Sequence, residues 1–456
     1  MKTFEKFQIK GSKTLNRTWT AAMPDNTVGK RAYINARLLD PATGMDEEGA
    51  ILTDGETIAD VGQHLFTNGA PEDIPTIDCK GKCLAPGLVD IRVQIREPGE
   101  EHKGTIESAG RSATAGGVTT MVCLPNTAPI IEDMSVVEFV ARRARLIGLS
   151  KIYPYAAVTK GLQGLELAEL GILAQAGAVA FTDGEKVVAD AQVLRRALTY
   201  ARTFDLLIIQ HAEEPSLANG VMNAGEVATR LGLSGIPPVA ETIIVERDIR
   251  LVELTGGKLH FAHVSTSEAI NAIRKAKAKG LQITCDTAPP YFALNETSVG
   301  EYRTFAKLSP PLRSEEDRKS VVEGIVDGTI DVIASDHAPQ DEDSKRVPFS
   351  QAAYGGVGLE TLLSVSLELY HNGHMTLLET LSKLTCSPAN LLGLPAGRLQ
   401  TGGKADFTVF DPDRGWQVNA DDLASKAKNT PFDGRPVQGM VLRTVIDGRT
   451  VYRVDS

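Results

Sequence analysis

Eight short apolar runs alternate with helix-like segments through the middle of this 456-residue chain, and this alternation restricts its fold most strongly. The segments between the runs carry apolar residues at helical spacing, as in 136–147 and 194–201. The expected strands are 88–95, 119–124, 151–158, 178–183, 206–211, 258–263, 282–286 and 331–336. Strands that alternate with helices form a parallel sheet, and eight such units close into a barrel. The predicted fold class is therefore α/β, with a (β/α)8 TIM barrel.

Short β-type runs bounded by turns lie on both sides of this region. They are 32–39, 50–55 and 57–61 before it, and 405–411, 439–448 and 450–452 after it. They predict a small β-sandwich domain built from both termini, with residues 30–84 as its first half, 85–394 as the barrel and 395–456 as its second half. Residues 1–29 are polar and aperiodic, and we expect an N-terminal arm without a catalytic role that becomes ordered only against a partner.

Charge and cysteine content exclude several classes of protein. The formal net charge of −10 and the absence of a basic tract argue against a nucleic-acid or anionic-membrane partner. Five cysteines without paired metal spacing predict reduced thiols in the cytoplasm, and we expect Cys79 and Cys83 to be half-buried packing residues rather than a metal site. No secretory or transmembrane segment is expected.

The first expected barrel strand has two different faces. In the segment 84–99 (LAPGLVDIRVQIREPG), apolar residues alternate with Asp90, Arg92, Gln94 and Arg96 until Pro98 and Gly99 end the run. In such barrels, chemistry takes place at the carboxyl ends of the strands. The polar face of this strand is therefore expected at the site.

Several motifs in the order and spacing of one family support a specific resemblance. They are AGGVTT at 115–120, LPNT at 124–127, QHAEE at 210–214, HVST at 263–266, ASDHAP at 334–339 and GGVGLET at 355–361. Together with the first strand they resemble the dihydroorotase branch of the amidohydrolase superfamily, from Lys30 to Tyr452. The resemblance implies a barrel of the amidohydrolase type and the reversible ring closure of carbamoyl aspartate to dihydroorotate by metal-bound hydroxide.

The resemblance breaks at the metal ligands of the first strand. The family carries Asp-x-His-x-His there, whereas this chain has Arg92 and Gln94 at the two histidine positions. A guanidinium stays protonated and has no lone pair to give, and Gln is a weak ligand for zinc. Arg92 and Gln94 are therefore lost ligand positions.

The remaining family ligands are only partly kept. His211, His263 and Asp336 match the fifth, sixth and eighth strands, and Asp183 stands in a shortened fourth-strand motif as a doubtful ligand. Two interpretations are open for these residues: a residual zinc half-site of His211, His263 and Asp183, or core histidines with no metal. The cofactor expectation is accordingly none or one zinc. Asp336 is the catalytic base if the protein is active; we favour an ion pair in which Arg92 replaces the charge of the lost metal.

Substrate contacts of the family are also changed. The family's Pro-His-His, Lys-x-Asn-Pro-Pro-Leu-Arg and Asp-His-Ala-Pro-His motifs read PPY at 289–291, KLSPPLR at 307–313 and DHAPQ at 336–340. Arg96 and Asn126, which match the carboxylate-binding pair of the family, are retained. We expect these two residues either to bind substrate or to be inherited structure.

The resemblance to the dihydroorotase branch, together with these departures from it, leaves three functions open. The favoured one is a catalytically deficient dihydroorotase-like protein of pyrimidine biosynthesis that acts as a structural partner of aspartate carbamoyltransferase. The alternative is an active dihydroorotase or related cyclic-amide hydrolase working with a single zinc. A third is a sensor that binds dihydroorotate or carbamoyl aspartate without turnover. A homo-oligomer is expected in each case.

Overall fold

The computed structural model describes residues 17–19, 29–67, 69 and 71–454, and it contains all eight predicted barrel strands. Each is parallel to its hydrogen-bonded barrel neighbours. The strands are β7 (Leu88–Val93), β8 (Val118–Cys123), β9 (Lys151–Pro154), β10 (Phe181–Thr182), β11 (Leu207–His211), β14 (Lys258–Ala262), β15 (Ile283–Thr287) and β16 (Val332–Ile333). The predicted barrel is confirmed.

Two isolated bridges close the ring of strands. Strands β7, β8 and β9 form one sheet, and β10, β11, β14, β15 and β16 form another. The bridge between Ala156 and Phe181 joins β9 to β10, and the bridge between Val93 and His337 joins the end of β7 to the residues after β16. The closing contact therefore lies at the carboxyl ends of β7 and β16, where Arg92 and Asp336 are found.

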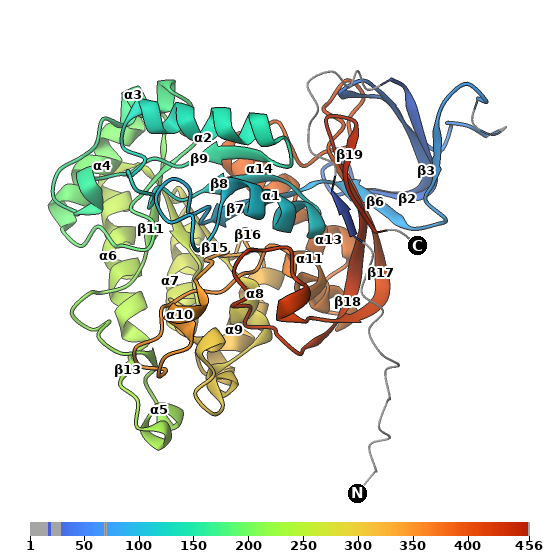
Figure 1. The fold of residues 1–456 in the computed structure, drawn as a ribbon. Coiled ribbons are helices and arrows are strands. Elements are labelled where there is room, and N and C mark those ends of the chain that lie inside the picture. Colours follow the sequence, from blue (N-terminus) through green and yellow to red (C-terminus); the bar gives the residue numbers. More distant parts are fainter. Residues whose placement is uncertain (1–16, 20–28, 68, 70, 455–456) are drawn as a thin grey trace, which may run out of the picture.

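Helices cover the outside of the barrel (Figure 1). Helix α2 is typical: Asp133 accepts a hydrogen bond from the backbone of Ser135 at its start, and Gly148 ends it at φ +64°. Its predicted stripe is buried at Val136, Val137, Val140 and Ala144, whereas Ile147 is half-buried.

The remaining helices differ in how they begin and end. The α-helices are α1 (Ile106–Ala115), α2 (Met134–Ile147), α3 (Leu170–Gln175), α4 (Ala191–Thr203), α5 (Glu226–Leu231), α6 (Val239–Thr255), α7 (Ser267–Ala278), α8 (Pro289–Ala293), α9 (Glu315–Val326), α10 (Glu342–Lys345), α11 (Leu362–Ser366), α12 (Glu368–His371), α13 (Leu377–Ser382) and α14 (Cys386–Leu392). Four short 3₁₀ helices are Lys160–Leu162, Glu296–Val299, Thr304–Ala306 and Ala420–Asp422.

Outside the barrel, a further sheet joins strands from both ends of the chain. Its strand order is β1-β19-β18-β17-β6-β2-β3-β4, with β5 paired to β2. Figure 1 shows the red carboxyl-terminal strands beside the blue amino-terminal ones. The strands are β1 (Arg17–Trp19), β2 (Arg31–Asp40), β3 (Met45–Asp54), β4 (Thr57–Gly62), β5 (Thr76–Asp78), β6 (Cys83–Pro86), β17 (Phe407–Gln417), β18 (Pro436–Ile446) and β19 (Arg449–Val454). A separate small pair is β12 (Met222–Asn223) and β13 (Gly235–Ile236).

The predicted N-terminal arm needs a correction at residues 17–19. These residues pair antiparallel with β19 of the same chain. Arg17 forms a 2.9 Å ion pair with the buried Glu360, and Trp19 Nε1 donates to the carbonyl of Arg111 at 3.1 Å. This part of the arm is therefore ordered without a partner, because the edge of β19 and a buried carboxylate hold it. The prediction for residues 1–16 and 20–28 lies outside the described residues.

All five cysteines are free, and Cys79 and Cys83 are fully buried rather than half-buried. Burial raises the pKa of Cys79 to about 12 and that of Cys83 to about 11. Both remain protonated thiols near neutral pH, which makes them poor metal ligands. No helix among the described residues has the length and apolar character needed to cross a membrane.

Candidate functional site

Arg92 and Asp336 form an ion pair at the barrel mouth, as the sequence predicts. Arg92 Nε lies 2.9 Å from Asp336 Oδ1, and its guanidinium is nearly inaccessible to solvent. A second guanidinium nitrogen, Nη2, donates to the carbonyl of Gly184 at 3.4 Å. Arg92 therefore connects the end of β7 with the loops after β16 and β10, which is the place of the family's metal centre according to the resemblance.

The two retained histidines bind each other. His211 Nδ1 and His263 Nε2 are 2.7 Å apart, and both rings are buried. His263 Nδ1 lies 3.2 Å from Asp336 Oδ2, and His211 Nε2 lies 3.6 Å from a carboxylate oxygen of Glu213. A continuous network of side-chain contacts thus runs from Glu213 through both imidazoles to Asp336 and Arg92.

The charges of these hydrogen-bonded side chains favour one protonation state of the network. Burial alone would raise the pKa of Asp336, but His263 and Arg92 hold it well below its usual range. Burial, and then the charge of Arg92, lower the pKa of His263. A charged carboxylate and guanidinium therefore flank a neutral imidazole near neutral pH.

This donor set does not fit a metal ion. Both ring nitrogens of His263 and Nδ1 of His211 are engaged within the network, and each oxygen of Asp336 already has a partner. Across the described parts of the chain, no group of three His, Cys, Asp or Glu residues is placed to hold a metal. The arginine supplies the positive charge that would otherwise come from a metal, so the pocket is electrostatically satisfied without one.

Asp183 lies outside the network, so the structure does not bring the predicted half-site together. Its carboxylate accepts hydrogen bonds from the backbone nitrogens of Val158 and Thr159, at 3.0 and 2.9 Å, and from the Thr159 hydroxyl. It therefore ties the segment after β9 to β10. The following residue, Gly184, adopts φ +72°, a conformation that glycine tolerates and aspartate rarely adopts.

The other polar side chains of β7 and of the residues just after it form hydrogen bonds between segments of the barrel mouth. Asp90 accepts hydrogen bonds from the backbone of Arg92 and Ser335, and burial raises its pKa to about 6. Gln94 Oε1 accepts a hydrogen bond from Asn126 Nδ2 at 3.3 Å. The second lost ligand position thus contacts one of the two predicted substrate-binding residues.

The two residues of the predicted carboxylate-binding pair, Arg96 and Asn126, each bind other groups of the protein. Arg96 Nη1 binds Glu100 at 2.7 Å and Nε binds the carbonyl of Pro339 at 3.1 Å, whereas Asn126 also contacts Glu185. A substrate carboxylate at Nη1 of Arg96 would have to displace Glu100. The remaining nitrogen, Arg96 Nη2, is buried without a partner. The role of Arg96 and Asn126 in binding substrate stays a prediction.

Backbone conformation is unusual at three residues of this region. Arg96, His263 and Asp336 have φ values of +62°, +39° and +51°. Non-glycine residues in this range are strained, and such residues are concentrated at functional sites. Three strained residues therefore lie at the barrel mouth, and two of them, His263 and Asp336, belong to the side-chain network.

A segment of residues 341–354, the mouth segment, is pinned over the barrel by a buried lysine. The sequence indicates only a solvated charged loop at 341–346. Instead, Lys345 is 3% exposed, and its Nζ donates to the carbonyls of Thr304, Lys307 and Ala353 at 3.1, 3.4 and 2.6 Å. Burial, and next the charge of Lys307, lower the pKa of Lys345 to about 7.

Replacing Lys345 by Met should release the mouth segment. One buried and two partly buried hydrogen bonds to backbone carbonyls would be lost, so we expect a loss of about 1–3 kcal/mol in unfolding free energy. Limited proteolysis with mass spectrometry should show faster cleavage within 341–354. The exposed Lys319 provides the control, because Lys319→Met should leave the cleavage pattern unchanged. Equal cleavage of wild type and K345M would contradict the pinning role.

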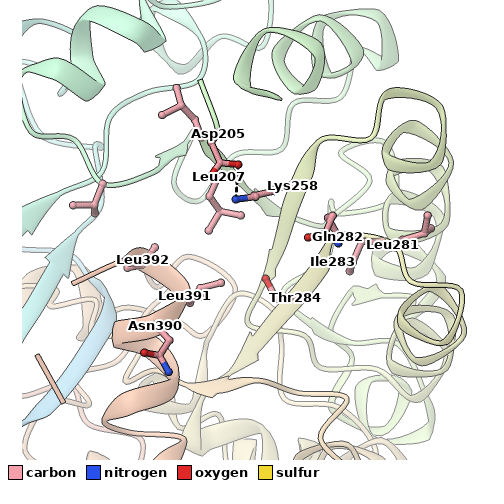
Figure 2. Close-up of a pocket in the computed structure, with 13 residues that line it drawn as sticks. Asp205, Leu207, Lys258, Leu281, Gln282, Ile283, Thr284, Asn390, Leu391 and Leu392 are labelled. Atoms are coloured by element: carbon pink, nitrogen blue, oxygen red, sulfur yellow. Dashed lines mark ion pairs between the residues drawn. The ribbon is translucent and has the colours of Figure 1, made fainter. Parts of the chain in front are cut away.

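Two cavities among the described residues lie at opposite ends of the barrel. The cavity that borders Asp336 has a volume of about 10 Å³, enough for one water molecule. A cavity of about 480 Å³ lies at the opposite, amino ends of β11, β14 and β15 (Figure 2). Its lysine, Lys258, is paired with Asp205 at 2.6 Å. In TIM barrels this end serves stability rather than chemistry.

Sequence reasoning missed three residues that shape the site. His260, which matches no catalytic position of the family and is expected as a surface or packing residue, is buried, and its Nε2 lies 2.8 Å from Asp286 Oδ2. Asp286 also accepts the backbone N–H of His263 at 2.7 Å. Glu241 accepts hydrogen bonds from the backbones of Ser265 and Thr266, just after His263. Helical spacing gives no sign of a buried acid, whereas the alternation of β14 places His260 inward.

The closed barrel, its strand-end polar network and the sheet made from both termini define a protein of the amidohydrolase class. The structure is similar to an L-hydantoinase (dihydropyrimidinase) from Arthrobacter aurescens, with a TM-score of 0.83, 25% sequence identity and coverage of 93% of this chain and 96% of that one. A dihydropyrimidinase from Brevibacillus agri shares the fold with a TM-score of 0.81 over 93% of this chain and 95% of its own, at 23% identity.

Sequence comparisons place the chain more narrowly. The model of the family described as dihydro-orotase-like matches residues 81–269. A dihydroorotase of Anaplasma phagocytophilum (strain HZ) is 48% identical over 93% of this chain and 95% of the relative. One from Pelobacter propionicus is 46% identical over 92% of this chain and 98% of the relative. The chain belongs to the dihydroorotase family.

Proposed function

We propose that this chain serves pyrimidine biosynthesis as a dihydroorotase-family protein without metal-dependent turnover, and that it acts as a structural partner of aspartate carbamoyltransferase. The ion pair between Arg92 and Asp336 is the observation that carries the absence of metal-dependent turnover, whereas the partner rests on the family resemblance. The ion pair neutralises the carboxylate that would serve as general base, and it fills the position of the first-strand ligands with a group that cannot bind metal.

The rest of the network supports loss of the hydrolytic reaction. Metal catalysis needs ligands with free lone pairs and an open position for water. Here His211 and His263 bind each other, and a cavity that borders Asp336 has room for one water molecule. Without a metal, acid–base catalysis would rest on Asp336, whose lowered pKa makes it a weak base.

Binding of an acidic pyrimidine precursor has less support. Arg96 is already paired with Glu100, and Asn126 is held by Gln94 and Glu185. A ligand carboxylate at Nη1 of Arg96 would exchange one ion pair for another, which provides little net affinity. The retained arginine therefore serves the barrel mouth as a structural residue in this proposal.

The partner is tested by mixing the purified full chain with the catalytic trimer of aspartate carbamoyltransferase from the same organism. Size-exclusion chromatography with light scattering should give a new species of larger mass than either protein. Bovine serum albumin in place of the trimer serves as control and should elute separately. Two unchanged peaks at micromolar concentrations would exclude a stable complex. Whether the chain binds zinc and hydrolyses dihydroorotate is tested separately, by measuring zinc content and turnover.

A further inference from the structure

A cavity of about 520 Å³ lies where the barrel meets the β-sandwich, away from the barrel mouth. Helix α2 and strand β9 line it from the barrel, and the β18–β19 connection lines it from the sandwich. Beside it, Leu149 after α2 packs against Ile446 and Val451 of β18 and β19. The cavity is thus formed by two domains that are already in contact.

The charges around this cavity are unbalanced. Four cationic side chains line it, Arg145, Lys151, Lys404 and Arg449, together with one acid, Asp447. Lys151 is neutralised by Asp406 and Asp447 at 2.6 and 2.8 Å, and Lys404 by Glu56 at 2.7 Å.

The two arginines are the uncompensated cations. Neither the guanidinium of Arg145 nor that of Arg449 forms a hydrogen bond or ion pair with any described residue. Their guanidiniums come from different domains, one from α2 and one from β19. The carboxyl end of α2 at Gly148 adds partial negative charge here, so attraction for an anion has to come from these arginines.

The remainder of the lining is largely apolar. It includes Val137, Ala141, Ile152, Tyr153, Pro395 and Ile446. Cavities of about 300–1,000 Å³ with an apolar lining and a few charged groups are typical of small-molecule sites. Guanidinium groups bind phosphate and carboxylate through paired hydrogen bonds. By contrast, the cavity in Figure 2 has its lysine already paired, so it lacks a free charge.

We propose that this cavity binds a small organic anion with a planar apolar body and one phosphate or carboxylate group, the chemistry of a nucleoside monophosphate or an aromatic acid. The anion is held between Arg145 and Arg449, and the planar body lies on the apolar lining. Because the two arginines belong to different domains, the bound ligand links barrel and sandwich. This site is independent of the chemistry at Arg92 and Asp336.

Isothermal titration calorimetry on the full chain tests this proposal with four probes: AMP, benzoate, adenosine and inorganic phosphate. AMP or benzoate should bind more tightly than inorganic phosphate, and adenosine should not bind. A phosphate-type anion is assigned if AMP binds, and a carboxylate-type anion if benzoate binds. No binding of either probe, or phosphate binding as tightly as AMP, would overturn the proposal.

Variants separate a built site from nonspecific attraction. Arg145→Ala and Arg449→Ala should each weaken binding of the probe by about ten-fold, the loss expected for a charge-assisted hydrogen bond. Arg142, which is exposed on the same helix and does not line the cavity, is the matched control, and R142A should bind as wild type. The variants R145K and R449K keep a cationic side chain of similar length, so they serve as the conservative counterparts if an alanine variant misfolds. Unchanged affinity in R145A and R449A would contradict the proposal.

Discussion

Replacing Arg92 by methionine is expected to destabilise the protein by about 3–5 kcal/mol, because it leaves the carboxylate of Asp336 buried without its cation. Methionine approximates the length of the side chain, so the loss reports the charge rather than a large cavity. Urea unfolding followed by circular dichroism measures it. Arg111 on α1, whose ion pair with Glu107 is exposed, is the control, and R111M should change stability by less than about 1 kcal/mol.

The pair should also behave as a unit. Asp336→Asn in the R92M background removes the stranded charge, so the double variant should recover part of the lost stability. The pH dependence gives a second test. The pKa of Asp336 is depressed in the folded state, so its stabilising contribution is present above the unfolded pKa of about 3.9 and is lost as pH falls below it. Full additivity of R92M and D336N would contradict a coupled pair.

Restoring both histidines of the first strand should restore metal binding. In the double variant R92H/Q94H, two imidazoles replace two side chains that are 2% and 3% exposed, near His211, His263 and the released Asp336. We expect binding of about one zinc per chain after zinc loading and dialysis, as for a site with three or more protein ligands. Inductively coupled plasma mass spectrometry measures it.

The single variant Q94H is the matched control, since it adds an imidazole but keeps Arg92 in its ion pair. It should stay far below one zinc per chain. Dihydroorotate hydrolysis is not expected to return with the metal, because Ser309 and Gln340 still stand at substrate-contact positions of the family. If R92H/Q94H folds and binds no zinc, then Arg92 is not the residue that excludes the metal.

The fold was predictable because periodicity reports it directly. The alternation of apolar runs and helical stripes located all eight barrel strands, and the paired ends of the chain located the second sheet. The ion pair of Arg92 and Asp336 was also predictable, since the motifs place both residues at neighbouring strand ends and a buried carboxylate requires compensation.

The rest of the site depends on contacts that the sequence does not encode locally. The direct hydrogen bond between His211 and His263 depends on the ring orientations of two side chains from separate strands. Lys345 lies in a run of charges that resembles a solvated loop, yet three backbone carbonyls from distant segments bind it. Asp183 retains its motif position but its carboxylate binds the backbone after β9. These outcomes are set by tertiary packing rather than by spacing.

The central claim is that the barrel mouth holds an arginine-centred ion-pair network in place of a catalytic metal. The most direct measurement is the zinc content of the zinc-loaded, dialysed full chain, with dihydroorotate hydrolysis assayed on the same sample. We predict zinc far below one equivalent per chain and no turnover above background. Zinc near one equivalent per chain together with measurable hydrolysis would contradict the claim and would identify the protein as an active dihydroorotase.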